Sequence, residues 1–243
     1  MYVGCLFFWR YKLGYIKNLF KSLSRFELCL WLFSIITVTA SFLLAGNFNP
    51  LTLIASLIGV TSLIFIAKGY VIGQVLMIVF GLLYSIISLQ YCYYGEMITY
   101  LGMTAPIALM SAISWYRNPY KNSPEVTVSS LNALHRILLV VLTIIVTIVF
   151  YFILKAFNTP NLFSSTLSIA TSFSASYLAL MRSPVYAVAY AVNDLVLIVL
   201  WILASMENTS YIPVIMCFAI FFINDLYGFV SWQKMKKRQS SDI

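Results

Sequence analysis

The sequence predicts an all-α polytopic membrane protein with about eight transmembrane helices. Of its 243 residues, 62% are hydrophobic and only 9% are charged, whereas a soluble domain averages about 25% charged residues. Runs of roughly 17 or more apolar residues, long enough to cross a bilayer as helices, follow one another with short gaps. An outer-membrane barrel would show short alternating segments instead. The third observation is an uneven distribution of basic residues, which fixes a topology.

Turn-forming sequences separate the predicted helices. Asn47–Pro50, Asn158–Asn161 and Arg182–Pro184 combine Asn, Ser and Pro in the way that marks turns. The longest polar stretch, Arg117–His135, divides the chain into two halves of four helices each. We expect membrane helices over residues 28–46, 51–67, 71–91, 97–115, 136–156, 162–180, 184–204 and 211–232.

The remaining segments are expected at the membrane surface. Residues 1–27 form a basic, aromatic N-terminal segment without the apolar core of a cleavable signal peptide. Within it, residues 6–26 have the composition of an amphipathic helix lying on the membrane. Residues 116–135 and 233–243 are predicted to be a cytoplasmic loop and a basic cytoplasmic tail. Inside the fourth helix, Pro106 is expected to produce a kink.

The basic residues predict the orientation. With the N-terminus in the cytoplasm, eight crossings place every Lys and Arg except Lys155 on the cytoplasmic side. Such a bias is typical of the cytoplasmic loops of multi-pass proteins, so we expect both termini in the cytoplasm and the protein in the cytoplasmic membrane. The net charge of +8 then reflects topology and attraction to anionic lipid headgroups. A nucleic-acid partner is not expected.

The two halves resemble each other. Lys68 precedes the third helix as Arg182 precedes the seventh, and Ser-Trp-Tyr-Arg at 114–117 matches Ser-Trp-Gln-Lys at 231–234. An acidic residue lies in the outer loop of each half, Glu96 in the first and Glu207 in the second. Because the copies are offset by an even number of helices, they have the same orientation in the membrane. The pattern therefore predicts a parallel repeat related by an axis along the membrane normal.

The seventh helix carries a polar and aromatic face. At about 100° per residue, Tyr190, Asn193, Asp194 and Trp201 fall within one broad face. Asp194 lies near the middle of the helix, where insertion of a carboxylate costs about 2.5–3.5 kcal/mol. One interpretation is a ligand pocket, with rings that stack and polar groups that hydrogen-bond. The alternative is interhelical hydrogen bonding, which contributes about 0.6 kcal/mol per residue.

The last helix carries a second polar spot. Asn224 and Tyr227 lie three residues apart on one face, with Gly228 beside them. An amide and a phenol offer both donors and acceptors to a small polar ligand. Asp225 lies about 100° around the helix and fits either a packing anchor or a titrating group. We expect Asn224 and Tyr227 to face the polar side of the seventh helix across a pocket.

Several absences narrow the function. The sequence has no Walker A loop, Gly-x-Ser-x-Gly or HExxH motif, and its four cysteines are scattered. We therefore predict no cofactor, no metal site and no enzymatic activity. Two alternatives to transport stay open at this point. One is an accessory membrane protein without a path for substrate, and the other is an intramembrane enzyme that uses Asp194 and Asp225 as a pair.

Further motifs resemble a known family. The run Asn-Asp-Leu-Tyr-Gly-Phe at 224–229, then Trp232-x-Lys234, is similar to the PnuC family of vitamin transporters. Tyr84, Gln90-Tyr91, Tyr94-Gly95-Glu96, Pro106 and Trp115-Tyr116-Arg117-Asn118 fit the same pattern in the first half, so the likeness covers roughly residues 50–238. The resemblance implies a homotrimer whose subunits contain two parallel three-helix bundles, a linking helix and an extra N-terminal helix. The two bundles would be residues 51–115 and 162–232, the linking helix 136–156 and the N-terminal helix 28–46.

The same resemblance implies a function. The best-known members of the family take up nicotinamide riboside by facilitated diffusion, and the substrate is trapped by phosphorylation in the cytoplasm. Relatives carry thiamine, riboflavin or deoxynucleosides. The family's Asn-x-x-Tyr motif matches Asn224 and Tyr227, whereas its Trp-x-x-Trp motif is replaced by Ala187 and Tyr190, which leaves those other substrates open.

The expected binding site thus combines rings that stack on the base with polar groups that bind ribose or base edges. In this interpretation Asp194 binds a hydroxyl group or neutralises a cationic ring. The predicted substrate-binding residues are Tyr190, Asn193, Asp194, Trp201, Asn224 and Tyr227.

Overall fold

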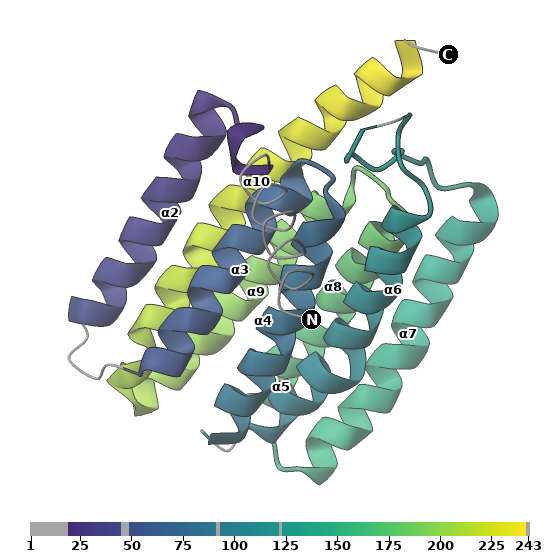
Figure 1. Cartoon of the computed structure of the whole chain (residues 1–243). Coiled ribbons are helices and arrows are strands. Elements are labelled where there is room, and N and C mark those ends of the chain that lie inside the picture. Colours follow the sequence, from purple (N-terminus) through teal and green to yellow (C-terminus); the bar gives the residue numbers. More distant parts are fainter. Residues whose placement is uncertain (1–18, 45–48, 91–92, 122, 242–243) are drawn as a thin grey trace, which may run out of the picture.

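The computed structural model describes residues 19–44, 49–90, 93–121 and 123–241, and almost all of them are helical (Figure 1). The predicted all-α class is confirmed. Most of the predicted N-terminal amphipathic helix lies outside the described residues. The elements are α2 (Arg25–Leu44), α3 (Pro50–Ala67), α4 (Val71–Gln90), α5 (Tyr94–Thr99), the π-helix η1 (Tyr100–Thr104), α6 (Ala105–Tyr116), α7 (Ala133–Ala156), α8 (Leu162–Leu180), α9 (Tyr186–Glu207), the 3₁₀-helix η2 (Thr209–Tyr211) and α10 (Ile212–Ser241).

The helices have the length and composition of membrane spans. In the described part of the chain, seven segments are long and apolar enough to cross a bilayer, with α5, η1 and α6 counted together as Tyr94–Tyr116. The one predicted span outside these seven, residues 162–180, coincides with α8, but its many Ser and Thr residues make it less apolar. The chain is therefore a multi-pass membrane protein, and the number of crossings stays a prediction.

The fourth predicted helix is interrupted. Its first part is α5, its middle is the π-helical turn η1, and α6 begins just before Pro106. Because proline has no N–H and its ring clashes with the carbonyl four residues earlier, the regular hydrogen-bond ladder cannot pass through it. The Ala105 N–H instead bonds the Tyr100 carbonyl, five residues back. The predicted kink is thus a widened turn.

Six helices form a closed ring in the order α3, α4, α6, α8, α9 and α10, with α10 returning to α3. Outside this ring, α2 packs on α3 and α10, and α7 packs on α8 (Figure 1). Large buried side chains such as Val60, Phe80, Leu200 and Phe218 fill its interior. The ring therefore leaves α2 and α7 with broad faces exposed, as expected for helices that border lipid or other subunits.

Equivalent contacts join the two halves at one end of the ring, the basic end, which carries Lys68 and Arg182. Gly69 and Arg182 both adopt left-handed backbone conformations, with φ of 70° and 57°, just past the ends of α3 and α8. Trp232 Nε1 on α10 donates a hydrogen bond to the Ile66 carbonyl at the end of α3, at 2.9 Å. Trp115 Nε1 on α6 donates to the Ala179 carbonyl near the end of α8, also at 2.9 Å. These matching bonds favour the predicted parallel repeat.

The loop between α6 and α7, here called the strap, lies across the basic end. Between α6 and α7, the Val126 N–H donates to the Gly69 carbonyl at 2.9 Å, and the Ser129 N–H donates to the Arg182 carbonyl at 3.0 Å. Val126 is buried. One short stretch of the predicted loop 116–135 therefore bonds the equivalent turns of both halves.

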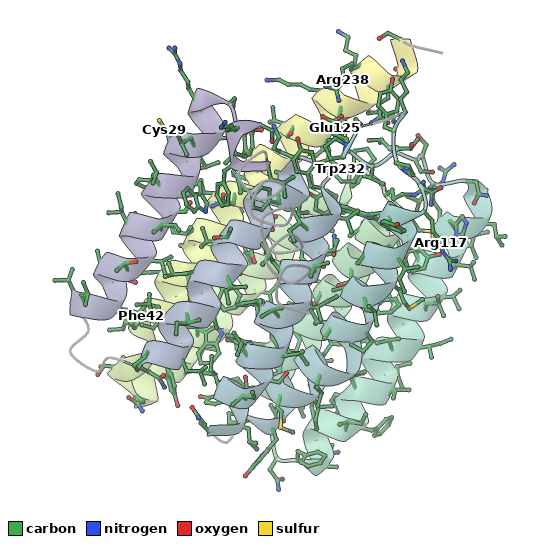
Figure 2. All side chains as sticks on the ribbon, in the orientation of Figure 1. Cys29, Phe42, Arg117, Glu125, Trp232 and Arg238 are labelled. Atoms are coloured by element: carbon green, nitrogen blue, oxygen red, sulfur yellow. The ribbon has the colours of Figure 1, made fainter. Side chains whose placement is uncertain are left out.

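The end of α10 holds this strap in place. Gln239 accepts a hydrogen bond from the Val128 N–H at 2.8 Å and donates one to the Val126 carbonyl at 3.1 Å. Arg238 forms an ion pair with Glu125, visible beside the strap in Figure 2. The predicted tail, 233–243, thus continues the last helix as far as Ser241, because the strap supplies partners that the local sequence does not reveal.

Candidate binding cavity

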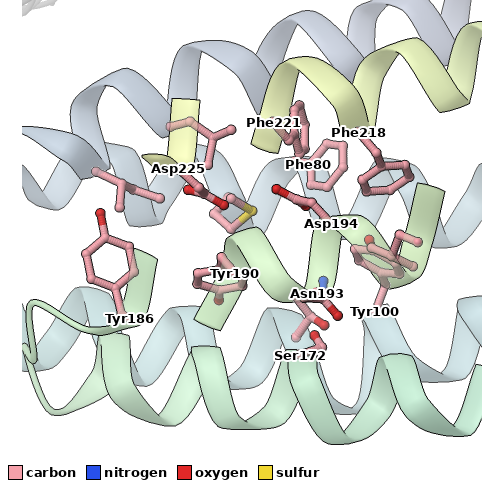
Figure 3. A pocket seen from close by; sticks show the side chains of 15 residues that line it. Phe80, Tyr100, Ser172, Tyr186, Tyr190, Asn193, Asp194, Phe218, Phe221 and Asp225 are labelled. Atoms are coloured by element: carbon pink, nitrogen blue, oxygen red, sulfur yellow. The ribbon is translucent and has the colours of Figure 1, made fainter. Parts of the chain in front are cut away.

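A cavity lies inside the ring, with aromatic, aliphatic and carboxyl side chains on its walls (Figure 3). The cavity is narrow, with a volume of about 40 Å³. A ligand larger than water therefore needs the rings to move apart. The lining residues are Leu63, Ile66, Met77, Phe80, Tyr100, Thr104, Ser172, Tyr186, Tyr190, Asn193, Asp194, Leu197, Phe218, Phe221 and Asp225.

Two lining residues of α9 are positioned by α8. The hydroxyl groups of Tyr190 and Ser176 lie 2.9 Å apart. Asn193 Oδ1 accepts a hydrogen bond from Thr171 Oγ1 at 2.9 Å. Because Thr171 fixes the carbonyl end of this amide, the two N–H donors are the part of Asn193 left for a ligand.

Two carboxyl groups meet at the cavity. Asp194 on α9 and Asp225 on α10 are 3% and 4% exposed, and their side chains lie within hydrogen-bonding reach of each other (Figure 3). Asp194 Oδ2 is buried and has no hydrogen-bond partner among the described residues. Since orphaned buried polar atoms are rare in folded proteins, this oxygen is a position at which a donor from a ligand or from water can bind.

Clusters of aromatic side chains lie toward both ends of the ring. Toward the basic end, the Tyr186 ring lies 4.8 Å from the Trp232 ring, which lies 5.3 Å from Trp115. Toward the opposite end, the Tyr93 and Tyr211 rings pack on Trp201 at 5.4 and 5.3 Å. These clusters therefore lie between the cavity region and the two ends of the ring.

The six predicted binding residues do not all lie on this cavity. Tyr190, Asn193 and Asp194 line it, as the helical pattern of α9 suggested. Trp201, on the same face of α9, is not among the lining residues. It is 3% exposed and belongs to the aromatic cluster at the end opposite the basic end. The pocket extends along only part of the predicted face.

Asn224 and Tyr227 point elsewhere, so the prediction that they face α9 across the pocket is wrong for this structure. Asn224 Nδ2 donates to Ser34 Oγ at 2.9 Å, and Tyr227 Oη donates to Glu27 Oε1 at 2.8 Å, both on α2. Helix α10 contacts α2, α3 and α9. A helical wheel shows which residues share a face but not which neighbour that face meets.

Because α10 turns Asn224 and Tyr227 toward α2, it places Asp225 at the cavity. Phe80, Tyr100 and Ser172, which the sequence pattern missed, line the cavity from α4, η1 and α8. The sequence feature that could have pointed to Tyr100 is Pro106, because Tyr100 lies in the turn that this proline widens. In the described residues, no group of three or more His, Cys, Asp or Glu side chains is placed to hold a metal ion.

A ring of helices in a multi-pass membrane protein, arranged around a buried, partly polar cavity, is typical of a membrane transporter for a small molecule. The model of the nicotinamide mononucleotide transporter family matches residues 49–234 of this chain. The chain therefore belongs to this family, and the resemblance to PnuC proteins is confirmed.

Two known proteins illustrate the relationship. The nicotinamide riboside transporter PnuC of Neisseria mucosa is 23% identical over 232 residues, which cover 92% of this chain and 87% of that protein. The crystal structure of the vitamin B3 transporter PnuC superposes with a TM-score of 0.80 at 21% identity, covering 93% of this chain and 97% of the other. The fold is thus shared along nearly the whole chain.

Proposed function

We propose that this protein carries nicotinamide riboside across the cytoplasmic membrane by facilitated diffusion, without catalysing a reaction. The observation that carries the proposal is the buried cavity of a transporter fold, in a chain whose curated relative is a nicotinamide riboside transporter. The basic end faces the cytoplasm in this proposal, because it bears the loops that contain nearly all Lys and Arg residues. Both termini are then cytoplasmic.

The cavity supplies the groups that a pyridine nucleoside needs. The Tyr190 ring stacks on the base, and the Asn193 N–H donors bind a ribose hydroxyl or the carboxamide oxygen. Asp194 accepts from a hydroxyl or balances the positive ring. Trp201 acts from the cluster that lies toward the opposite end, while Asn224 and Tyr227 hold α10 against α2 and so set the position of Asp225.

The structure leaves no room for a large ring at position 187, where the Trp-x-x-Trp motif is replaced. Ala187 is fully buried, and a Cβ atom added at Gly228 of α10 would lie 3.6 Å from the Ala187 Cβ atom. A large ring at position 187 would collide with α10 here. Stacking therefore depends on Tyr190 and the phenylalanines, which is why thiamine and deoxynucleosides belong in any substrate panel.

Two further parts of the proposal involve other molecules, namely the phosphorylation of the substrate and the assembly of several copies of this chain. Phosphorylation of the substrate in the cytoplasm makes uptake one-way, because a facilitator alone only equalises concentrations. A homotrimer fits the exposed faces of α7, of whose membrane-spanning window only 6% is buried, and the same faces fit lipid. Crosslinking in membranes distinguishes subunit contact from lipid contact.

Uptake of radiolabelled nicotinamide riboside into proteoliposomes tests the function. We expect saturable uptake that is competed by excess unlabelled substrate and reduced at least about tenfold by Tyr190→Ala with Asn193→Ala, since each lost contact is worth about 1–3 kcal/mol. The matched control is Glu125→Gln at the basic end. Absence of uptake for every candidate vitamin and nucleoside would favour an accessory membrane protein, and conversion of the substrate would favour an enzyme.

A further inference from the structure

The carboxyl pair of Asp194 and Asp225 has no positive partner. Among the residues that line the cavity there is no Lys, Arg or His. Of the ion pairs in the described residues, Lys68 is paired with Glu27 at 3.1 Å and Arg238 with Glu125, both at the basic end. Buried carboxyl groups are normally paired with a cation or hydrogen-bonded by donors. This pair has neither a cation nor a full set of donors, since Asp194 Oδ2 is orphaned.

The surrounding elements do not supply the missing charge. Helix α9 contributes the phenols of Tyr186 and Tyr190, η1 contributes Tyr100, and α10 contributes the Cys217 thiol nearby. Beyond Tyr100 lies the Glu96 carboxyl group. Helices α3, α4 and α8 add only apolar side chains and the Ser172 hydroxyl. All of these groups are neutral or acidic, so none of them balances a negative charge on the pair.

In the empty cavity, the two carboxyl groups can hydrogen-bond to each other only if one of them carries a proton. Two ionised carboxylates at this separation, away from water, repel strongly. A ligand with one positive charge changes this balance, because it attracts both carboxylates at once. A neutral ligand of the same shape provides no such compensation.

We infer that Asp194 and Asp225 together form a subsite that selects ligands carrying a positively charged ring over neutral ligands of the same shape. This inference rests on the proposed function and narrows its substrate class to cationic nucleosides and vitamins, such as those with a pyridinium or thiazolium ring. The aromatic walls support it. Tyr190, Phe80 and Phe221 present ring faces or edges to the same cavity, and ring faces attract cations by about 0.5–2 kcal/mol.

Two forms of one ligand test the charge directly. Nicotinamide riboside has a pyridinium ring, whereas dihydronicotinamide riboside differs by one added hydride and is neutral. Titration calorimetry on the purified protein measures the dissociation constant of each form. We expect the wild-type protein to bind the cationic form at least about tenfold more tightly, a difference of about 1.4 kcal/mol.

Asp194→Asn and Asp225→Asn keep the shape of each side chain and remove its charge. We expect each variant to weaken binding of the cationic form much more than binding of the neutral form, so that the preference falls to near one. Retained binding of the neutral form also shows that the variant is folded. Glu125→Gln removes a carboxylate from the basic end and is expected to keep the full preference.

The outcomes separate the inference from the function. Equal binding of both forms by the wild-type protein would mean that protons neutralise the pair and that it does not distinguish charged from neutral ligands. This result would overturn the inference but not the proposed transport function. An undiminished preference in both Asp variants would also overturn it. If neither form binds but a deoxynucleoside does, the proposed substrate itself is wrong, and the inference falls with it.

Discussion

The rings of Trp115 and Trp232 lie 5.3 Å apart between the two halves of the molecule, and each indole N–H bonds the end of a helix in the other half. Trp115 extends from the first half to α8, and Trp232 from the second half to α3. The halves are thus joined by a reciprocal pair of hydrogen bonds at the basic end. Beneath this pair, Tyr186 packs on Trp232 and forms part of the cavity wall.

Replacing either indole with a smaller ring tests this junction. Both side chains are almost fully buried, and phenylalanine removes the N–H donor and part of the packed ring volume. We expect Trp115→Phe and Trp232→Phe each to lower the free energy of unfolding by about 1–3 kcal/mol. Thermal unfolding of the purified protein in detergent measures the effect. If the double variant loses no more free energy of unfolding than one single variant, the two bonds act as a unit. Unchanged stability in both single variants would mean that neither bond contributes.

The strap depends on one side chain of α10. Gln239 is 5% exposed and bonds both Val126 and Val128, so Gln239→Ala removes two hydrogen bonds from the loop before α7. We expect faster tryptic cleavage of this loop at Lys121, followed by gel electrophoresis of the fragments. The control is Gln233→Ala, at an exposed position of the same helix. Equal cleavage of the two variants would show that the strap is held by other contacts.

Gly59 on α3 controls the width of the cavity. A Cβ atom at this position would lie 2.5 Å from the end of the Phe221 ring and 3.0 Å from the Phe80 ring. Both rings line the cavity, so we expect Gly59→Ala to push them and to reduce substrate uptake severalfold. Gly102→Ala is the matched control, because nothing lies within 4 Å of its added Cβ atom. Unchanged uptake by Gly59→Ala would indicate that the rings move away from the path of the substrate.

The Tyr190 ring and its hydroxyl group make separable contributions. Tyr190→Phe keeps the ring and loses the bond to Ser176, whereas Tyr190→Ala removes both. Stacking of a base on a ring is worth about 1–3 kcal/mol, so we expect about 5- to 150-fold weaker binding for the Ala variant and a few-fold change for the Phe variant. Titration calorimetry with nicotinamide riboside measures both. Similar losses in the two variants would assign the effect to the hydroxyl group.

The helix face that lines the cavity was predictable for α9, which turns one polar face inward, but not for α10, whose faces meet several neighbouring helices. On α9, the spacing of Tyr190, Asn193 and Asp194 identified three cavity residues because α9 turns one polar face inward. On α10, three neighbouring helices contact different faces, and Asn224 and Tyr227 meet α2 rather than the cavity. The sequence contains no local signal for that choice.

By itself, the sequence determined the all-α membrane fold, the breaks between helices and the family, because apolar run length, turn residues and motif order are local properties of the chain. Only the tertiary structure decided that Asp225, and not Asn224, meets Asp194, and that a strap and two reciprocal tryptophans join the halves. These features depend on how helices distant in sequence are rotated and packed against one another. That packing is set by the sum of many interhelical contacts rather than by any single motif.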